Sequence, residues 1–303
     1  MRHTVLGILA LLLWSSTIAF TRSLTERLGT GTAAAAIFLI SGGIGCAYLV
    51  VTRQIGAVRR LPRAYLVGCG ALFVLYMVCI YSAVGSAASR LHVIGAGIIN
   101  YLWPGLTLAF SVPILKKKAR LWLLPGAVAA FAGAALAVAH GGAFSWTAFA
   151  ADLTSGSASY VWALGAALSW ALYSNLSRRW AGEAEGTAVP VFLLASGIVW
   201  AALRCLRPEQ AHWTPRAAAE LLYMATLPTL AAYSFWEAAM RKGNVVFVAS
   251  LSYSTPLLST AISCIYLRVA PGAMLWVACL LVIGGAIVCR LSVSDGPPLP
   301  TAD

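Results

Sequence analysis

Long apolar segments alternate with short polar gaps along the whole chain. An α-helix needs about 20 consecutive, mainly apolar residues to cross the hydrocarbon core of a bilayer. Segments of this length predict ten transmembrane helices, at residues 4–22, 33–52, 62–83, 92–114, 120–139, 160–178, 188–204, 217–239, 245–267 and 271–290. Stretches such as Leu121–Ala139 are apolar throughout, which excludes the alternating pattern of membrane β-strands.

The composition excludes a soluble globular protein. Of the 303 residues, 60% are hydrophobic and only 10% are charged, and the mean hydropathy is +0.84. An ordinary soluble domain is about one quarter charged. We therefore expect an all-α polytopic membrane protein whose ten helices leave no large soluble domain.

The net charge of +12 comes from residues in the polar gaps rather than from one basic surface. With ten spans and the N-terminus inside, 14 of the 21 Lys and Arg residues fall on the cytoplasmic side and 7 on the other. Positive residues gather in cytoplasmic loops, so the bias predicts that both termini are cytoplasmic. No nucleic-acid partner is expected. The tail at 292–303 contains three prolines and is predicted to be disordered in the cytoplasm.

The chain offers no grouping of residues for metal binding or covalent chemistry. Its seven cysteines stand singly, and its four histidines never share a helical turn. No nucleophile is accompanied by a base in the pattern that a hydrolase needs. We therefore expect no metal, no cofactor and no enzymatic activity.

A polar gap rich in Gly, Ser and Ala divides the predicted helices into two blocks of five. Residues 1–140 form the first block, 141–159 an external linker, and 160–291 the second block. With an offset of 152 residues, the segment NYLWP at 100–104 aligns with SYSTP at 252–256. Because each block has an odd number of helices, the second block must enter the membrane upside down. Two inverted repeats with a substrate site between them are a transporter architecture.

This pattern resembles the drug/metabolite transporter superfamily, whose ten-helix members consist of two inverted five-helix repeats with both termini inside. The resemblance covers residues 4–290, and the NYLWP segment with the residues up to Lys116 looks like the fourth helix of the aromatic amino-acid exporter branch. It implies a protein of the bacterial inner membrane that exports aromatic and some other amino acids, or drug-like cations. The chain departs from a plain repeat at Pro228, because the third helix has no matching proline.

Prolines and aromatic residues near the middle of predicted helices mark a candidate transport site. Pro104 and Pro256 each remove a helical hydrogen bond, and both are predicted to be hinges beside a cavity. Central aromatic rings suit an aromatic substrate by stacking and its ammonium by cation-π attraction. The predicted substrate-binding residues are Trp14, Tyr76, Tyr81, Asn100, Tyr101, Trp103, Trp170, Ser252 and Tyr253.

The remaining polar and small residues bear on coupling and assembly. Glu237 is the one carboxylate well inside a predicted span. Its spacing from Arg241, one helical turn away, favours a salt bridge over a role in proton transfer. We therefore expect facilitated export.

A drug, cation or other metabolite exporter is the alternative function, and a pore is the next. Gly133 and Gly285 predict close helix packing within a monomer or a weak dimer.

Overall fold

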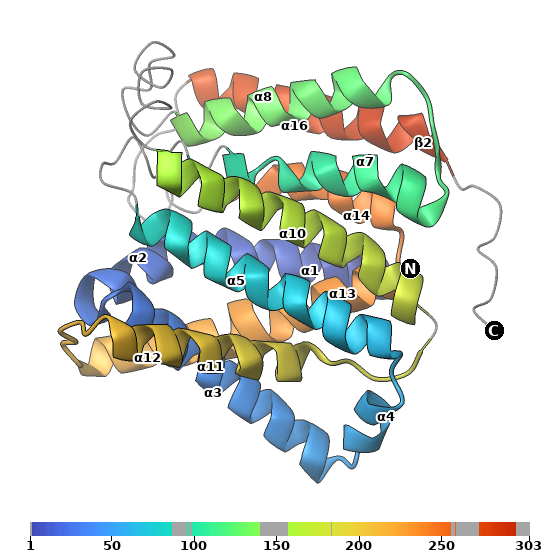
Figure 1. Ribbon diagram of the computed structural model, residues 1–303. Helices are drawn as coiled ribbons and strands as arrows, with labels where there is room; N and C mark the ends of the chain where they lie inside the picture. The colour runs from blue at the N-terminus through green and yellow to red at the C-terminus, as the bar shows by residue number, and fades with distance from the viewer. Residues whose placement is uncertain are drawn as a thin grey trace.

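The computed structural model is a bundle of helices, most of which run along one common direction (Figure 1). It describes residues 2–86, 96, 99–139, 157–182, 184–255, 258 and 273–294. The helices of the first half are α1 (Arg2–Ser15), α2 (Thr17–Leu28), α3 (Thr30–Val51), α4 (Ile55–Arg59), the π-helical η1 (Ala64–Cys69), α5 (Gly70–Gly85), α7 (Trp103–Leu115) and α8 (Leu123–Ala139). Those of the second half are α10 (Ser157–Ala181), α11 (Val189–Leu206), α12 (Pro215–Met224), the π-helical η2 (Ala225–Ala231), α13 (Ala232–Lys242), α14 (Val245–Leu251), the 3₁₀-helical η3 (Ser252–Ser254) and α16 (Ala273–Ser292).

Three helical segments among the described residues are long and apolar enough to cross a membrane. They are Thr30–Val51, Ala64–Gly85 and Val189–Leu206. Described helices overlap each of the ten predicted ranges, and the first range is divided by a turn at Ser16. The number of membrane crossings stays a prediction.

Two short strands were not predicted by the sequence pattern. Strand β1 (Lys118–Ala119) pairs with β2 (Val293–Ser294) in antiparallel register, with Lys118 opposite Ser294. The amide of Arg120 adds a 2.8 Å hydrogen bond to the carbonyl of Ser292. Residues 295–303 lie outside the described residues, so the disordered tail stays a prediction there.

The helices of the two halves are interleaved rather than packed as separate domains. Helix α3 lies against α11, α5 against α10, α1 against α13, and α8 against α16. Figure 1 shows α8 and α16 side by side at one edge of the bundle. Each of these pairs joins a helix from residues 2–139 to one from residues 157–292.

Helices α3 and α11 touch through two glycines that make reciprocal contacts. A side chain added at Gly42 would overlap the backbone of Leu194, and one added at Gly197 would overlap the backbone of Leu39. The higher-numbered residue of α3 therefore contacts the lower-numbered residue of α11, so the two helices are antiparallel. Each glycine also follows a serine in a similar local sequence, LISG in α3 and LASG in α11.

Small residues also bring α8 and α16 together. A side chain at Gly285 would overlap the backbone nitrogen of Ala130, and one at Gly126 would overlap Val288 and Cys289. Close approach through small residues is a common way to pack helices in membranes. The glycine-containing faces of the fifth and tenth predicted helices thus pack inside this chain.

Candidate functional site

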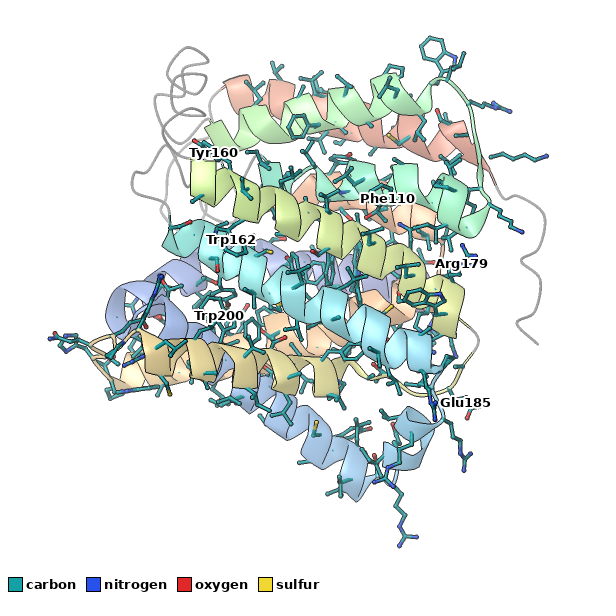
Figure 2. All side chains as sticks on the ribbon, viewed as in Figure 1. Phe110, Tyr160, Trp162, Arg179, Glu185 and Trp200 are labelled. Atoms are coloured by element: carbon teal, nitrogen blue, oxygen red, sulfur yellow. The ribbon has the colours of Figure 1, made fainter. Side chains whose placement is uncertain are left out.

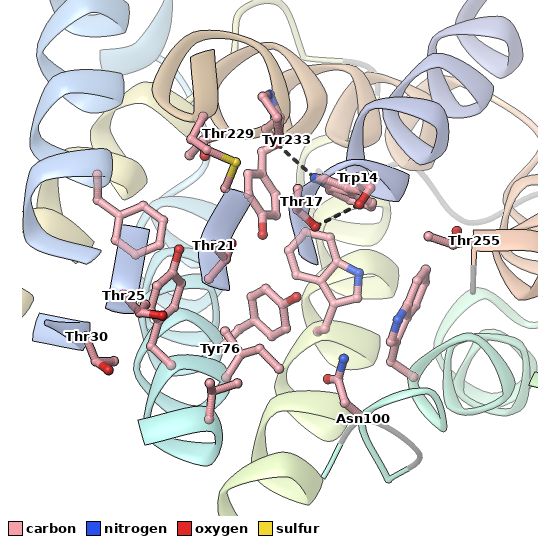
Figure 3. Close-up of a pocket in the computed structure, with 18 of the residues that line it drawn as sticks. Trp14, Thr17, Thr21, Thr25, Thr30, Tyr76, Asn100, Thr229, Tyr233 and Thr255 are labelled. Atoms are coloured by element: carbon pink, nitrogen blue, oxygen red, sulfur yellow. Dashed lines mark hydrogen bonds between the residues drawn. The ribbon is translucent and has the colours of Figure 1, made fainter. Parts of the chain in front are cut away.

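A cavity of about 190 Å³ lies between helices of both halves (Figure 3). Its walls are mostly aromatic rings and threonine side chains. The lining residues are Trp14, Thr17, Thr21, Thr25, Thr30, Phe38, Tyr76, Ile80, Tyr81, Val84, Asn100, Tyr101, Trp103, Trp170, Met224, Pro228, Thr229, Tyr233 and Thr255.

The structure brings seven of the nine predicted substrate-binding residues to this cavity, and they come from four of the predicted helices. Those seven are Trp14, Tyr76, Tyr81, Asn100, Tyr101, Trp103 and Trp170. Ser252 and Tyr253 lie elsewhere. The Ser252 hydroxyl donates to the carbonyl of Val248 at 2.9 Å, and Tyr253 is buried in a cluster with Ala130 and Val282.

The backbone is irregular just before both predicted hinge prolines. Tyr101 and Leu102 form a turn, and Pro104 then stands in the first turn of α7, where proline fits without breaking a hydrogen bond. In the second half, α14 gives way to the 3₁₀ helix η3 at Ser252–Ser254. Pro256 itself lies outside the described residues.

Trp170 is the centre of an aromatic cluster at one side of the cavity. Its ring lies tilted against Tyr76, with centroids 4.6 Å apart, and meets Trp14 edge to face at 5.7 Å. Tyr233 lies 5.4 Å from Trp170, and Trp103 lies 6.4 Å from it in a perpendicular orientation. Edge-to-face and tilted pairs at these separations are favourable aromatic arrangements. The rings therefore form a rigid, preformed wall.

Trp14 is fixed by a hydrogen bond across the bundle. Its indole nitrogen donates to the carbonyl of Pro228 at 3.0 Å, as one dashed line in Figure 3 shows. Pro228 lies in the π-helical segment η2, where the helical hydrogen-bond pattern is altered. The third predicted helix also contains a π-helical segment, η1. The third helix of each five-helix block therefore has a π-helical segment, although only the segment in the second block contains a proline.

The sequence prediction missed several lining residues. Thr17, Thr21 and Thr25 recur at four-residue spacing on α2, which places them on one face of that helix. That spacing was the available signal. Tyr233 is the other omission of note, because it contacts both Trp14 and Trp170 although it belongs to the eighth predicted helix.

The described lining residues carry no ionisable acid or base other than tyrosine. Among the described residues there is also no group of three or more His, Cys, Asp or Glu side chains that could hold a metal ion. Binding in this cavity must therefore use ring faces, hydroxyls, amides and backbone groups. Such a lining suits a ligand that has no net charge.

A buried polar network around Glu237 and Arg241 lies toward the opposite end of the bundle. The two side chains form a 3.2 Å ion pair at 1% and 3% exposure, as the i, i+4 spacing predicts. The Glu237 carboxylate also accepts hydrogen bonds from the hydroxyls of Tyr65 and Thr187. This network joins η1, α13 and the start of α11.

Arg241 also ties down the loop between α10 and α11. Its guanidinium donates to the carbonyls of Ala181 at 2.7 Å, Gly186 at 2.7 Å and Ala184 at 2.6 Å. In Figure 2, Arg179 and Glu185 mark this end of the bundle, whereas Tyr160 and Trp162 mark the other. The cavity reaches toward the latter end, because the Ser159 hydroxyl at the start of α10 bonds to Ala83 beside the lining residue Val84.

Comparison with known proteins assigns the fold to a family. A profile of the EamA-like transporter family matches residues 2–139 and 157–291, which is most of the chain. The chain belongs to the EamA-like transporter family. It is thus a multi-pass membrane protein of the drug/metabolite transporter superfamily, in agreement with the resemblance seen in the sequence.

Relatives of known name share this family along nearly their whole length. The aromatic amino acid exporter YddG of Escherichia coli is 30% identical over 295 residues, which cover 97% of this chain and 99% of the relative. The proteins of the same name from Ancylobacter novellus and Salmonella typhimurium are 32% and 29% identical, and the matches cover 95% and 96% of this chain and 96% and 97% of the relatives. A crystal structure with 28% sequence identity superposes with a TM-score of 0.80, over 96% of this chain and 98% of that one.

Proposed function

We propose that this EamA-like transporter exports aromatic amino acids through the cavity between its two halves. The single observation that carries the proposal is the wall of rings around Trp170, because it offers preformed faces to a flat apolar side chain. Relatives that match nearly the whole chain carry the name of aromatic amino acid exporters, which supports the same substrate class.

The lining residues define the substrate site of this proposal. Trp14, Tyr76, Trp103 and Trp170 bind the aromatic ring, and Tyr81, Asn100 and Tyr101 line the remaining walls. An amino acid is a zwitterion with no net charge at neutral pH. It suits a described lining that holds no fixed charge, since a charged side chain buried there would favour a charged ligand instead.

The proposal includes ten transmembrane helices arranged as two inverted five-helix repeats. The pairs α3 with α11 and α8 with α16 each join helices at equivalent places in the two halves. Exchanging the halves also turns the pair α1 with α13 into the pair α10 with α5, and both pairs are present. The reciprocal contacts of Gly42 and Gly197 agree with a two-fold relationship between antiparallel equivalents.

Transport then proceeds by alternating access. In the predicted topology both termini are cytoplasmic, so the helix ends at Thr30 and Val84 face the external side. The cavity extends to these residues, whereas the Glu237–Arg241 network lies at the cytoplasmic end. This arrangement corresponds to an outward-facing state in which the substrate can leave the cell.

We further propose that export is facilitative. Proton or cation coupling normally needs an acid or a histidine near the middle of the membrane. The described lining has neither, and Glu237 is engaged by Arg241, Tyr65 and Thr187. The gradient of the amino acid itself would drive its exit.

Counterflow in proteoliposomes tests the function. Vesicles are loaded with unlabelled phenylalanine and diluted into labelled phenylalanine, and we expect a transient, saturable uptake that tryptophan inhibits. Inhibition by drug-like cations without any effect of phenylalanine or tryptophan would instead identify a drug exporter. Uptake that never saturates would identify a pore, and either result would refute the proposal.

A further inference from the structure

The lining of the cavity includes two buried polar atoms without a hydrogen-bond partner. They are the side-chain oxygen Oδ1 of Asn100 and the hydroxyl oxygen Oγ1 of Thr255. Both residues line the cavity, and Figure 3 shows them on the side away from Thr25 and Thr30. A buried polar atom that lacks a partner costs free energy, so such atoms in a cavity are suited to binding a ligand.

The free hydroxyl of Thr255 is unlike the neighbouring hydroxyls on the same segment. Ser252 donates to the carbonyl of Val248 at 2.9 Å, and Ser254 donates to that of Leu251 at 2.6 Å. Bonding back to the helix in this way is the ordinary role of such groups. The carbonyl four residues before Thr255 belongs to Leu251 and already accepts from Ser254. Thr255 is only 8% exposed, so bulk water does not replace the missing partner.

Both unpartnered atoms can accept a hydrogen bond, which favours a ligand group rich in donors. An ammonium has three donors and no acceptor, so it can donate to both kinds of oxygen. A carboxylate has only acceptors and would be repelled by the amide oxygen of Asn100. The rings of Trp103 and Trp170 lie on the same part of the wall, with centroids 6.4 Å apart, and ring faces attract an ammonium.

The two residues also occupy related places in the two halves. In the alignment with an offset of 152 residues, Asn100 corresponds to Ser252 and Trp103 to Thr255. The stretch before each proline therefore supplies one of the two oxygens. A ligand group held between them would contact both halves of the protein at the point where the helices are irregular.

We propose that Asn100 and Thr255 form the subsite for the α-ammonium group of the transported amino acid. The inference deepens the proposed function and rests on it. The ammonium lies between Asn100 Oδ1 and Thr255 Oγ1, and the aromatic side chain of the substrate lies against the rings around Trp170.

The test separates the two charges of the substrate by means of simple analogues. Purified protein is titrated with phenylalanine, with phenethylamine, which keeps the ammonium and lacks the carboxylate, and with 3-phenylpropionate, which keeps only the carboxylate. Binding is read from the quenching of tryptophan fluorescence, and phenylalanine counterflow is measured in parallel. We expect Thr255→Val and Asn100→Leu each to weaken phenylalanine and phenethylamine about tenfold while changing 3-phenylpropionate little. Asn100→Asp is expected to strengthen the binding of phenethylamine.

Ser250→Ala is the matched control. Its hydroxyl is also buried and unpartnered, but Ser250 is not among the residues that line this cavity. It should leave all three affinities unchanged, and the thermal unfolding midpoint of every variant in detergent shows whether it is folded. Equal weakening of phenethylamine and 3-phenylpropionate, or no weakening in folded variants, would overturn the subsite. Absence of phenylalanine counterflow in the unsubstituted protein would refute the proposed function instead, whatever the fluorescence titration with phenethylamine gives.

Discussion

The indole rings of Trp14 and Trp170 meet edge to face with their centroids 5.7 Å apart, although the residues are 156 positions apart in the chain. The predicted repeat makes them equivalent in the first and sixth helices when the offset there is 156 residues instead of 152. In the proposed inverted repeat, a residue and its equivalent touch only near the axis that relates the two halves. On that proposal, the aromatic wall of the cavity lies near this axis, where a movement of one half against the other would change its contacts.

The contribution of the ring faces can be measured at Trp103. We expect Trp103→Ala to weaken the transport of phenylalanine and tryptophan by a few-fold to about 30-fold, because stacking and cation-π contacts are each worth about 0.5 to 2 kcal/mol. Small apolar amino acids should lose much less. Counterflow of labelled substrates at equal protein levels gives the ratio. Trp122→Ala is the control, since that indole is 68% exposed and lies outside the cavity lining. Equal losses for tryptophan and alanine would place the aromatic site elsewhere.

The close contact of α3 with α11 predicts opposite effects for two adjacent glycines. Gly42→Ala places a methyl group against the backbone of Leu194, and overpacking of this kind costs about 1–3 kcal/mol. Gly43→Ala meets nothing within 4 Å and gains up to about 1 kcal/mol of helix propensity. The thermal unfolding midpoint in detergent should fall for Gly42→Ala and stay or rise for Gly43→Ala. The same change in both would argue against a tight helix contact.

The buried ion pair predicts a large loss of stability when one partner is removed. Glu237→Gln leaves the Arg241 charge uncompensated, and Arg241→Met strands the Glu237 charge and three loop carbonyls. Each should cost roughly 3–5 kcal/mol, with Arg241→Met the more severe.

Arg216 supplies the control for that pair, because it also bonds a glutamate one turn away but is 65% exposed. Arg216→Gln should cost about 1 kcal/mol or less. Unfolding in detergent, followed by circular dichroism, measures all three variants. A Glu237→Gln variant as stable as Arg216→Gln would show that the network carries little of the stability.

The predicted topology can be tested by labelling single cysteines. In a variant without the seven native cysteines, Gly56→Cys lies in α4 on the predicted cytoplasmic side, and Ala158→Cys lies at the exposed start of α10 on the external side. An impermeant thiol reagent added to intact cells should label Ala158→Cys and spare Gly56→Cys. The reverse labelling pattern would show that the protein has the opposite orientation in the membrane.

Facilitative export predicts that a pH gradient alone does not concentrate the substrate. Proteoliposomes with equal phenylalanine on both sides and an imposed pH difference should show no net uptake in either direction. Concentrative uptake that a protonophore abolishes would demonstrate proton coupling. It would then direct attention to Glu237, the acid that the structure buries among Arg241, Tyr65 and Thr187.

Much of the site could be predicted because its physical signal is local. Trp14 and Trp170 stand in the middle of predicted apolar segments, where an indole N–H needs a partner, and Trp14 finds one at the carbonyl of Pro228. The pairing of Glu237 with Arg241 follows in the same way from their spacing on one helix. Neither inference required knowledge of how distant helices pack.

The choice of Ser252 and Tyr253 shows where local signals end. A 3₁₀ helix turns about 120° per residue and an α-helix about 100°, so the three residues of η3 rotate the following side chains by about 60°. The sequence pattern does not predict this change of helix type. As a result Thr255 lines the cavity, and Tyr253 packs beside α8 and α16 instead. Tyr233 was not predicted for a related reason. The π-helical segment η2 precedes it and also changes the direction of the side chains that follow.

The glycine contact at Gly42 and Gly197 has a mechanical consequence. Because backbone lies against backbone at this point, the two helices have no room to move closer together. The two helices can still tilt relative to each other about this contact. With the cavity toward one end of the bundle and the Glu237–Arg241 network at the other, a tilt that spreads one end must squeeze the opposite end. Under the proposed alternating-access mechanism, the two ends of the transport path are then not open at the same time, so substrate is exported without a continuous leak.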